Sequence, residues 1–370
     1  MGLKSGFESL PSFDGWKLDI RANYSGSDRK SGLISPDGAR YMVKYSDKRA
    51  PRNDLTSSYV NNVVSEYVSS HVLGMLGYPV HETELGTLDG EVVVACRNFV
   101  PAGGELLEFE RFMRRRYDSH DIGRVPSIGQ IYDILESDPV LSPQAGRFKS
   151  CYWDRFVGDA LVGNFDRHKG NFGYLINADD SVAASPIYDN GSTLYPNLSE
   201  DGMRDVLDDP KEIMKRIKLF PNAALEMQGK KVGYYDMMAS GIYAELTHAV
   251  VSAVPRIRNA MPAVREFINA CGFLSGTRKD FYNVMLAERM AFILEPAYEK
   301  CVFRRFDHGA RERLEAGADY SADDFERWWE RGGSSVGREA ADIRDGVVAE
   351  RTGGSARTTG KNGGHGGLEQ

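Results

Sequence analysis

Apolar residues recur at helical spacing in one stretch near the start of the chain. Within residues 60–76 the spacing i, i+3, i+4, i+7 is followed by Val60, Val63, Val64, Tyr67, Val68, Val72, Met75 and Leu76. Gly77 and Pro79 come after this pattern, and both residue types commonly mark the end of a helix. The pattern therefore predicts one amphipathic helix whose apolar face is buried in a core.

Two short apolar segments flank this predicted helix. Residues 39–46, ARYMVKYS, are rich in β-branched and aromatic side chains and follow an S-P-D-G turn sequence. Residues 91–100, EVVVACRNFV, follow a second turn sequence, L-D-G at residues 88–90. Both segments predict strands, so we expect residues 1–100 to form a small β-rich lobe that contains one helix.

The pattern becomes helical after the P-A-G-G sequence at residues 101–104. One helical face is marked by Phe148, Cys151, Tyr152, Phe156, Ala160 and Leu161. Residues 331–370 are dominated by Gly, Ser and Thr, and such a segment cannot bury enough apolar surface to offset its ordering entropy. We therefore expect an α+β fold with a small lobe (1–100), a larger helical lobe (101–330) and a disordered Gly-rich tail (331–370).

Charge and cysteine content narrow the class of protein. The 370 residues carry a net charge of -7, whereas a general nucleic-acid binder is usually basic. The four cysteines lie far apart without a Cys-x-x-Cys pair, which disfavours a disulfide framework and a zinc ribbon. No apolar run approaches the roughly 18 residues of a membrane span, and the first residues lack a signal-peptide core. The sequence therefore predicts a cytoplasmic protein without direct nucleic-acid or membrane contact, and leaves delivery into another cell open.

The densest cluster of chemical groups is the sequence GNFDRHKGNFG at residues 163–173. Asp166 and Asn171 are five positions apart, the spacing of the base and of a magnesium-binding amide in a protein-kinase catalytic loop. The carboxylate accepts the proton of the attacking hydroxyl, and the amide oxygen is a hard ligand for magnesium. A second sequence, PIYDNG, brings Asp189 to the position of a second magnesium ligand. Residues 174–189 predict a β-hairpin that turns at residues 177–181.

A lysine at the end of an apolar strand is a second unusual feature. An unpaired buried ammonium costs free energy, so Lys44 needs anionic partners. Nucleotide phosphates would serve, and so would Glu66, which flanks the apolar face of the predicted helix. Before this strand, residues 24–34 contain Gly26 and Gly32, which would let backbone N–H groups approach phosphates.

These segments resemble the HipA-like serine/threonine kinases of bacteria, and most closely their compact, cell-translocating type. The resemblance is carried by GNFDRHKGNFG, SPIYDNGSTLYP, YMVKY and SEYVSSHVLGMLG and spans residues 24–195. It implies a two-lobed, protein-kinase-like fold that uses ATP and Mg²⁺ to phosphorylate Ser or Thr in a protein substrate. Larger HipA toxins carry an additional N-terminal domain before the nucleotide loop, whereas only residues 1–23 precede that loop here.

The resemblance also implies a role for each candidate residue. Asp166 would be the base, Lys44 would contact the phosphates and pair with Glu66, and His168 would order the loop or contact the phosphoryl group. The implied catalytic residues are Asp166, His168, Lys44 and Glu66. The implied metal ligands are Asn171 and Asp189. The implied nucleotide-binding residues are Lys44, the loop residues Gly26, Ser27, Lys30 and Ser31, and the adenine hinge residues Cys96, Asn98 and Phe99.

Partners and regulation follow from the same resemblance. It implies an antitoxin partner, a toxin or effector role, and autophosphorylation as a switch. Residues that could carry the phosphoryl group are Ser27, Ser31, Ser192 and Thr193. Two alternatives stay open at this point: a lipid or small-molecule kinase, since D-R-H-x-x-N also occurs there, and a nucleotide-binding pseudokinase, against which the complete set of polar residues argues.

Overall fold

The computed structural model describes residues 9–22, 29–46 and 61–332. The disordered tail expected over residues 331–370 therefore lies almost entirely outside the described residues, as do Gly26 and Ser27 of the expected nucleotide loop. Among the described residues, no helix combines the length and the apolar character that crossing a membrane requires.

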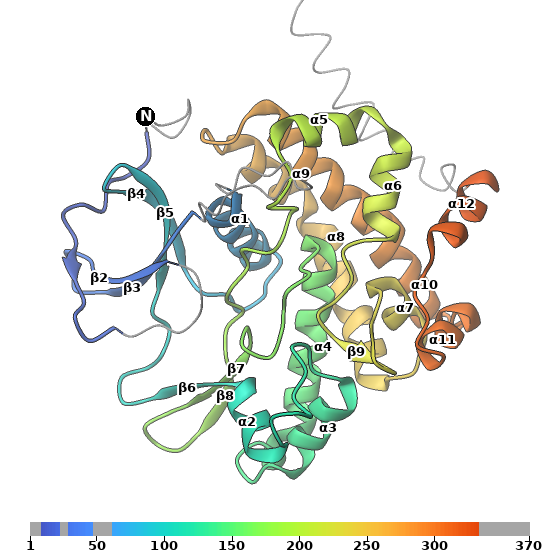
Figure 1. The fold of residues 1–370 in the computed structure, drawn as a ribbon, viewed down its shortest axis with the longest axis horizontal. Coiled ribbons are helices and arrows are strands. Elements are labelled where there is room, and N and C mark those ends of the chain that lie inside the picture. Colours follow the sequence, from blue (N-terminus) through green and yellow to red (C-terminus); the bar gives the residue numbers. More distant parts are fainter. Residues whose placement is uncertain (1–8, 23–28, 47–60, 333–370) are drawn as a thin grey trace, which may run out of the picture.

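The N-terminal part is a five-stranded antiparallel sheet with one helix (Figure 1). The strand order is β1-β2-β3-β5-β4. The strands are β1 (Lys17–Leu18), β2 (Lys30–Ile34), β3 (Arg40–Tyr45), β4 (Thr83–Leu88) and β5 (Glu91–Arg97), and the helix is α1 (Asn61–Met75). Both strands and the helix predicted from the apolar pattern are present, and Gly77 follows the helix with a positive φ of 80°.

Strand β5 is buried on both faces, which explains its nearly continuous apolar sequence. Val93 and Ala95 belong to a small core with residues of β2 and β3. Val92, Val94 and Cys96 face the other way and join the main core, to which α1 contributes its apolar stripe. The helix therefore fastens the sheet to the rest of the molecule.

The C-terminal part is mostly helical, and its centre is formed by α4 and α8 (Figure 1). The longer helix α8 (Ala244–Ala270) also contacts α1. The remaining helices are α2 (Phe109–Arg116), α3 (Ile128–Ser137), α4 (Ala145–Val162), α5 (Glu200–Asp208), α6 (Pro210–Lys218), α7 (Tyr234–Ala239), α9 (Gly276–Arg289), α10 (Glu295–Val302), α11 (His308–Glu315) and α12 (Ala322–Glu330). A sheet followed by helices confirms the predicted α+β, two-lobed architecture.

A three-stranded sheet of order β6-β7-β8 lies beside α2 at one end of the molecule (Figure 1), and it was only partly predicted. The hairpin is present as β7 (Gly173–Ile176) and β8 (Val182–Ala184), and its turn is closed by a hydrogen bond from Asn177 N–H to Ser181 O. The segment after residue 104 was expected to be helical, but it first forms β6 (Glu105–Glu108), which pairs with β7. A two-residue hairpin, β9 (Glu226–Met227) and β10 (Lys230–Lys231), lies among the helices.

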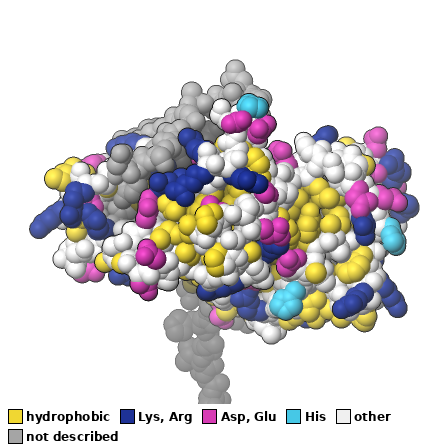
Figure 2. Space-filling view, turned by 90° about the horizontal axis from the view of Figure 1, so that it is seen from below, with side chains coloured by type: hydrophobic (Ala, Val, Ile, Leu, Met, Phe, Trp, Pro, Cys, Tyr) yellow, Lys and Arg dark blue, Asp and Glu magenta, His cyan; other side chains and the backbone are white. Residues whose placement is uncertain are grey.

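The charge distribution on the surface follows the composition. Figure 2 views the molecule from the end where α2, α3 and β6–β8 lie in Figure 1. Basic and acidic side chains are interspersed on this face around exposed apolar side chains. Neither sign of charge dominates the coloured part of this face, whereas a nucleic-acid backbone is attracted by an extended positive patch.

Candidate active site

A cleft of about 1070 Å³ lies between the N-terminal sheet and the helical part. Its walls come from β2, β3, α1, β5 and the loops on either side of β7 and β8. Ten of the candidate catalytic, metal-binding and nucleotide-binding residues line it: Lys30, Lys44, Glu66, Cys96, Asn98, Phe99, Asp166, His168, Asn171 and Asp189. Lys44 and Asp189, which are 145 positions apart in the sequence, thus meet in one cavity.

The lysine of β3 is held by two carboxylates. Lys44 Nζ lies 2.8 Å from Glu66 Oε2 on α1 and 2.8 Å from Asp189 Oδ1 on the loop after β8. Burial alone would lower the pKa of Lys44, but the charges of Asp189 and Glu66 raise it well above its ordinary value. For Glu66 the effects are reversed: burial alone would raise its pKa, but Lys44 and His81 lower the pKa below its ordinary value. Both shifts favour the charged forms of Lys44 and Glu66.

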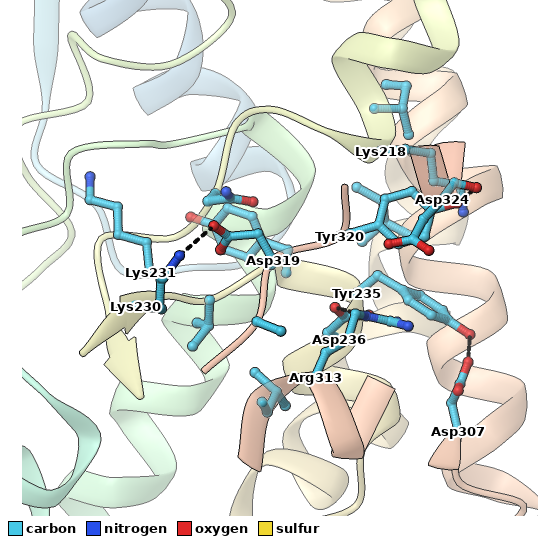
Figure 3. Close-up of a pocket in the computed structure, with 18 of the residues that line it drawn as sticks. Lys218, Lys230, Lys231, Tyr235, Asp236, Asp307, Arg313, Asp319, Tyr320 and Asp324 are labelled. Atoms are coloured by element: carbon cyan, nitrogen blue, oxygen red, sulfur yellow. Dashed lines mark hydrogen bonds and ion pairs between the residues drawn. The ribbon is translucent and has the colours of Figure 1, made fainter. Parts of the chain in front are cut away.

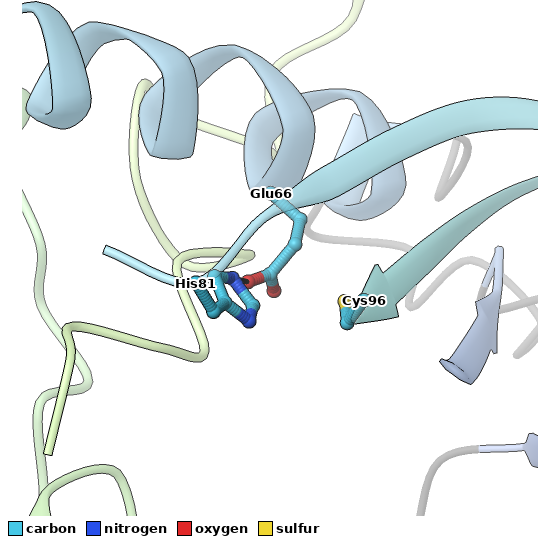
Figure 4. Close-up of side chains that lie close together, drawn as sticks. All are labelled: Glu66, His81 and Cys96. Atoms are coloured by element: carbon cyan, nitrogen blue, oxygen red, sulfur yellow. Dashed lines mark ion pairs between the residues drawn. The ribbon is translucent and has the colours of Figure 1, made fainter. Parts of the chain in front are cut away.

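Glu66 has a second set of partners that the sequence did not reveal. Its Oε1 accepts the backbone N–H of Asn190 at 2.8 Å and lies 3.0 Å from His81 Nε2. Figure 4 shows His81 and Cys96 on either side of this carboxylate, and the ligand atoms of the three residues lie within 4.8 Å of one another. Burial raises the pKa of the Cys96 thiol, and Lys44 already neutralises Glu66. The cluster is therefore better explained as a support for Glu66 than as a metal site.

The catalytic-loop sequence begins where α4 ends. Gly163 closes the helix in the left-handed conformation with φ 66°, and the N–H of Asp166 then donates to Asn164 Oδ1 at 3.0 Å. Asn171 Nδ2 donates to the backbone oxygen of Asp166 at 2.8 Å. The carboxylate of Asp166 faces the cleft, where Arg124 Nη2 lies 3.2 Å away. Burial raises the pKa of Asp166, and the charges of His168 and Arg124 partly oppose the rise.

Arg167 connects this loop to the loop that carries Asp189. Its guanidinium donates to both oxygens of Asp159 on α4, at 3.0 and 2.9 Å, and to Asn190 Oδ1 at 2.6 Å. It also donates to the backbone oxygens of Asn171, Tyr188 and Asp189. The sequence pattern gave Arg167 no role of its own. Its only signal was its place between Asp166 and His168.

Two hard oxygen ligands for a divalent cation face the same cleft. Asn171 uses its amide nitrogen for Asp166, which leaves its Oδ1 for a ligand. Asp189 has φ 58°, and its exposed carboxylate, 42% accessible, is partly occupied by Lys44. An amide and a carboxylate oxygen suit Mg²⁺, which keeps several waters or phosphate oxygens in its shell. The residues present therefore fit a nucleotide-bound magnesium ion.

His168 has a defined tautomer in its neutral form. Its Nδ1 accepts the N–H of Gly170 at 3.0 Å, so the proton of the neutral ring resides on Nε2. The side chain lines the cleft beside Asp166. It can therefore donate a hydrogen bond to an anion bound there.

The residues expected to form an adenine hinge, Cys96, Asn98 and Phe99, line the cleft, but part of the backbone of this segment is already hydrogen-bonded. Asn98 N–H donates to Arg40 O at 2.8 Å, and Val100 N–H donates to Asn98 Oδ1 at 3.0 Å. An adenine ring bound here would have to form hydrogen bonds with other backbone groups of this segment. The ring of Phe99 lies 5.6 Å from that of Tyr188, centroid to centroid, and both side chains line the cleft.

The described end of the expected nucleotide loop is a strand. Lys30 and Ser31 belong to β2, where Lys30 lines the cleft and Ser31 does not. Ser31 Oγ lies instead 3.2 Å from Tyr45 Oη. Gly32 is needed for packing rather than for a phosphate contact, because a Cβ there would lie 2.2 Å from the Cβ of Ala22.

The sequence comparison and the structure comparison both find the same relative. No family model matches the chain. It is 32% identical over 294 residues to the serine/threonine-protein kinase CtkA of Helicobacter pylori strain J99, covering 79% of this chain and 89% of the relative. The crystal structure of the Helicobacter pylori proinflammatory kinase CtkA superposes with a TM-score of 0.73 at 30% identity, over 81% of this chain and 100% of that one. A Shewanella oneidensis HipA complex matches at 12% identity with a TM-score of 0.36, over 82% and 70% of the two chains, too weakly to argue from.

Proposed function

The chain belongs to the family of the serine/threonine-protein kinase CtkA, the compact type of HipA-like kinase, and on this premise we propose that it transfers the γ-phosphoryl group of Mg-ATP to a Ser or Thr hydroxyl of a protein. The observation that carries the proposal is the position of Lys44, whose Nζ lies 2.8 Å from Glu66 Oε2 and 2.8 Å from Asp189 Oδ1 in the cleft that Asp166 and Asn171 also line. Each of these groups has a task in phosphoryl transfer.

Asp166 would orient the acceptor hydroxyl and take its proton. Hydrogen bonds of its backbone hold Asp166 in place, and its carboxylate faces the cleft, where a substrate hydroxyl would compete with the exposed Arg124. A pKa raised by burial makes a carboxylate a stronger base, which suits this role. His168, with its proton on Nε2, would donate to an oxygen of the transferred group.

Lys44 would exchange one carboxylate partner for nucleotide phosphates. Asn171 and Asp189 would hold the magnesium ion, which when bound neutralises charge on the phosphate oxygens. Glu66, held by His81 and Asn190, keeps the ammonium of Lys44 at the edge of the cleft. The roles of these residues rest on this geometry and on the family resemblance.

The described residues reduce the number of candidate autophosphorylation sites. Thr193 is buried and bonded to Ser69 and to Asn190 O, so a phosphoryl donor cannot reach it without rearrangement. Ser192 lines the cleft. Among the described candidates we therefore favour Ser192, and Ser27 lies outside the described residues. An antitoxin partner and a toxin role stay predictions from the resemblance.

The test is transfer of label from ATP in the presence of magnesium, compared between wild type and Asp166→Ala. We expect wild type to label itself or a protein acceptor, and Asp166→Ala to fold and bind nucleotide but lose nearly all transfer. Mapping the modified residue would identify the switch. Equal labelling of both proteins would contradict the role of Asp166, and nucleotide binding without transfer by wild type would revive the pseudokinase alternative.

A further inference from the structure

A second cavity, of about 440 Å³, lies in the helical part, outside the cleft (Figure 3). It is bordered by the end of α6, the β9–β10 hairpin, α7, α11 and α12. Aromatic side chains make up much of its wall: Tyr234, Tyr235, Phe292, Tyr320 and Trp328. Its volume is within the range of small-molecule sites, about 300–1,000 Å³.

The most unusual group in this cavity is Lys218, the last residue of α6. Its ammonium lies 5.1 Å from the ring centroid of Trp328 and 5.2 Å from that of Tyr235. Its single hydrogen bond in the described part of the chain goes to the backbone oxygen of Phe292, at 3.3 Å. Within those same residues, no carboxylate oxygen comes within 4.0 Å of its Nζ.

The carboxylates that border the cavity are engaged with other groups. Asp236 forms a two-point contact with Arg313. Asp307 accepts from Tyr235 Oη at 3.0 Å and from the N–H of Ala310 at 3.0 Å. The two that remain are Asp319, paired with Lys230, and Asp324, which caps α12 and pairs with Arg327.

A surplus of positive charge therefore remains. Lys231 and Arg331 line the same cavity, and across the described ranges neither has a carboxylate oxygen within 4.0 Å. Burial lowers the pKa of Lys218 to about 8, although Asp236 and Asp307 oppose the shift. A charge held at such a cost is poorly explained by packing, because Met would fill the same space without it.

We propose that this cavity binds a small organic anion, an apolar or aromatic body that carries a carboxylate, sulfonate or phosphate group, with Lys218 as its counter-ion. The aromatic wall would contact the body of the ligand, and Lys231 and Arg331 would add to the positive potential. The proposal concerns a site separate from the cleft and does not depend on the roles assigned to the cleft residues.

The test uses the aromatic sulfonate 8-anilinonaphthalene-1-sulfonate as a fluorescent probe with the full chain. Titrations are made with the cleft saturated by a non-hydrolysable ATP analogue, and the fluorescence of the bound probe reports its binding. We expect saturable binding by wild type and a loss of affinity of at least about tenfold in Lys218→Met, as for one lost hydrogen bond to a charged group.

Two variants make the result specific. Lys215→Met removes a lysine of the same helix that pairs with Glu212 at 2.7 Å and does not line the cavity, so it should bind the probe like wild type. Lys218→Arg keeps the cation and should retain most of the affinity. Absence of saturable binding by wild type, or equal affinity of Lys218→Met and Lys215→Met, would overturn the proposal. Removing an unpaired buried charge should not unfold the protein, which urea denaturation of both variants checks.

Discussion

At the scale of the residue, side chains such as Arg167 hold the candidate site residues of the cleft in position. Arg167 satisfies Asp159, Asn190 and three backbone oxygens at once, and so sets the spacing between the loops of Asp166 and Asp189. Arg167 and Asp159 form a buried ion pair. Burying two charges costs free energy, and removing one of them costs more, because the other is then left as an uncompensated buried charge.

Arg167→Met is expected to lower the free energy of unfolding by about 3–5 kcal/mol, since Asp159 would be left buried without its cation. Urea denaturation measures the change. The double variant Arg167→Met/Asp159→Leu removes both charges and should recover part of the stability without recovering kinase activity. Full activity in either variant would show that the two loops do not need this connection.

The pKa of Asp166 leads to a prediction about pH. Because burial raises this pKa, Asp166 becomes protonated at a higher pH than an ordinary aspartate, and if it is the base, kcat/KM should fall as pH drops through the raised value. Arg124 lowers that pKa, so Arg124→Gln should move the acid limb of the profile to still higher pH. The exposed Arg204→Gln on α5 is the control and should leave the limb in place. An unmoved limb in Arg124→Gln would argue against Asp166 as the titrating base.

At the scale of the element, the small β6–β7–β8 sheet fixes the catalytic-loop segment at its far end. The backbone N–H groups of Phe109 and Glu110, at the start of α2, donate to Phe172 O and Lys169 O, both at 2.9 Å. Gly173 allows β6 to approach, because a Cβ there would lie 2.3 Å from Leu107 O. The loop is thus anchored by α4 on one side and by this sheet on the other.

Gly173→Ala should therefore destabilise the protein by about 1–3 kcal/mol through overpacking against the backbone of β6. It should also reduce kinase activity more than this loss of stability explains. Gly146→Ala, on α4, meets nothing within 4 Å and should be neutral or slightly stabilising. Thermal unfolding and initial rates of the two variants would be compared, and equal behaviour would mean that β6 tolerates displacement.

At the scale of the whole molecule, the sheet and the helical part are joined across the cleft of the candidate active site. One connection is the Lys44–Asp189 ion pair, and another is the network from α1 through Glu66 and Ser70 to Asn190. A ligand that contacts both sides should stabilise the entire fold.

Mg-ATP at one hundred times its dissociation constant should raise the free energy of unfolding by about 2.7 kcal/mol. Wild type and Asp166→Ala should both show the rise in melting temperature, because the base is not needed for binding. Lys44→Met and Asp189→Asn should lose most of it. Stabilisation that persists in all variants would point to a nucleotide site elsewhere.

Local sequence patterns were enough to predict a large part of the fold and of the candidate site. The helix of residues 60–76, the strand that ends near Lys44 and the hairpin before Asp189 depend on neighbours within a few positions. The spacing from Asp166 to Asn171 is likewise local, so its chemistry could be read without a fold. The functional roles drawn from these patterns stay predictions until activity is measured.

Only the tertiary structure decided which groups hold these residues in position. Asn190 and Glu66 are 124 positions apart, and β6 is a strand because β7, more than sixty residues later, supplies its hydrogen bonds. Lys218 is a further example. Its ammonium donates to a backbone oxygen because packing of the helices pairs a neighbouring carboxylate, Asp236, with Arg313. Sequence determines periodicity and short-range spacing, whereas burial and long-range pairing arise only when distant segments pack together.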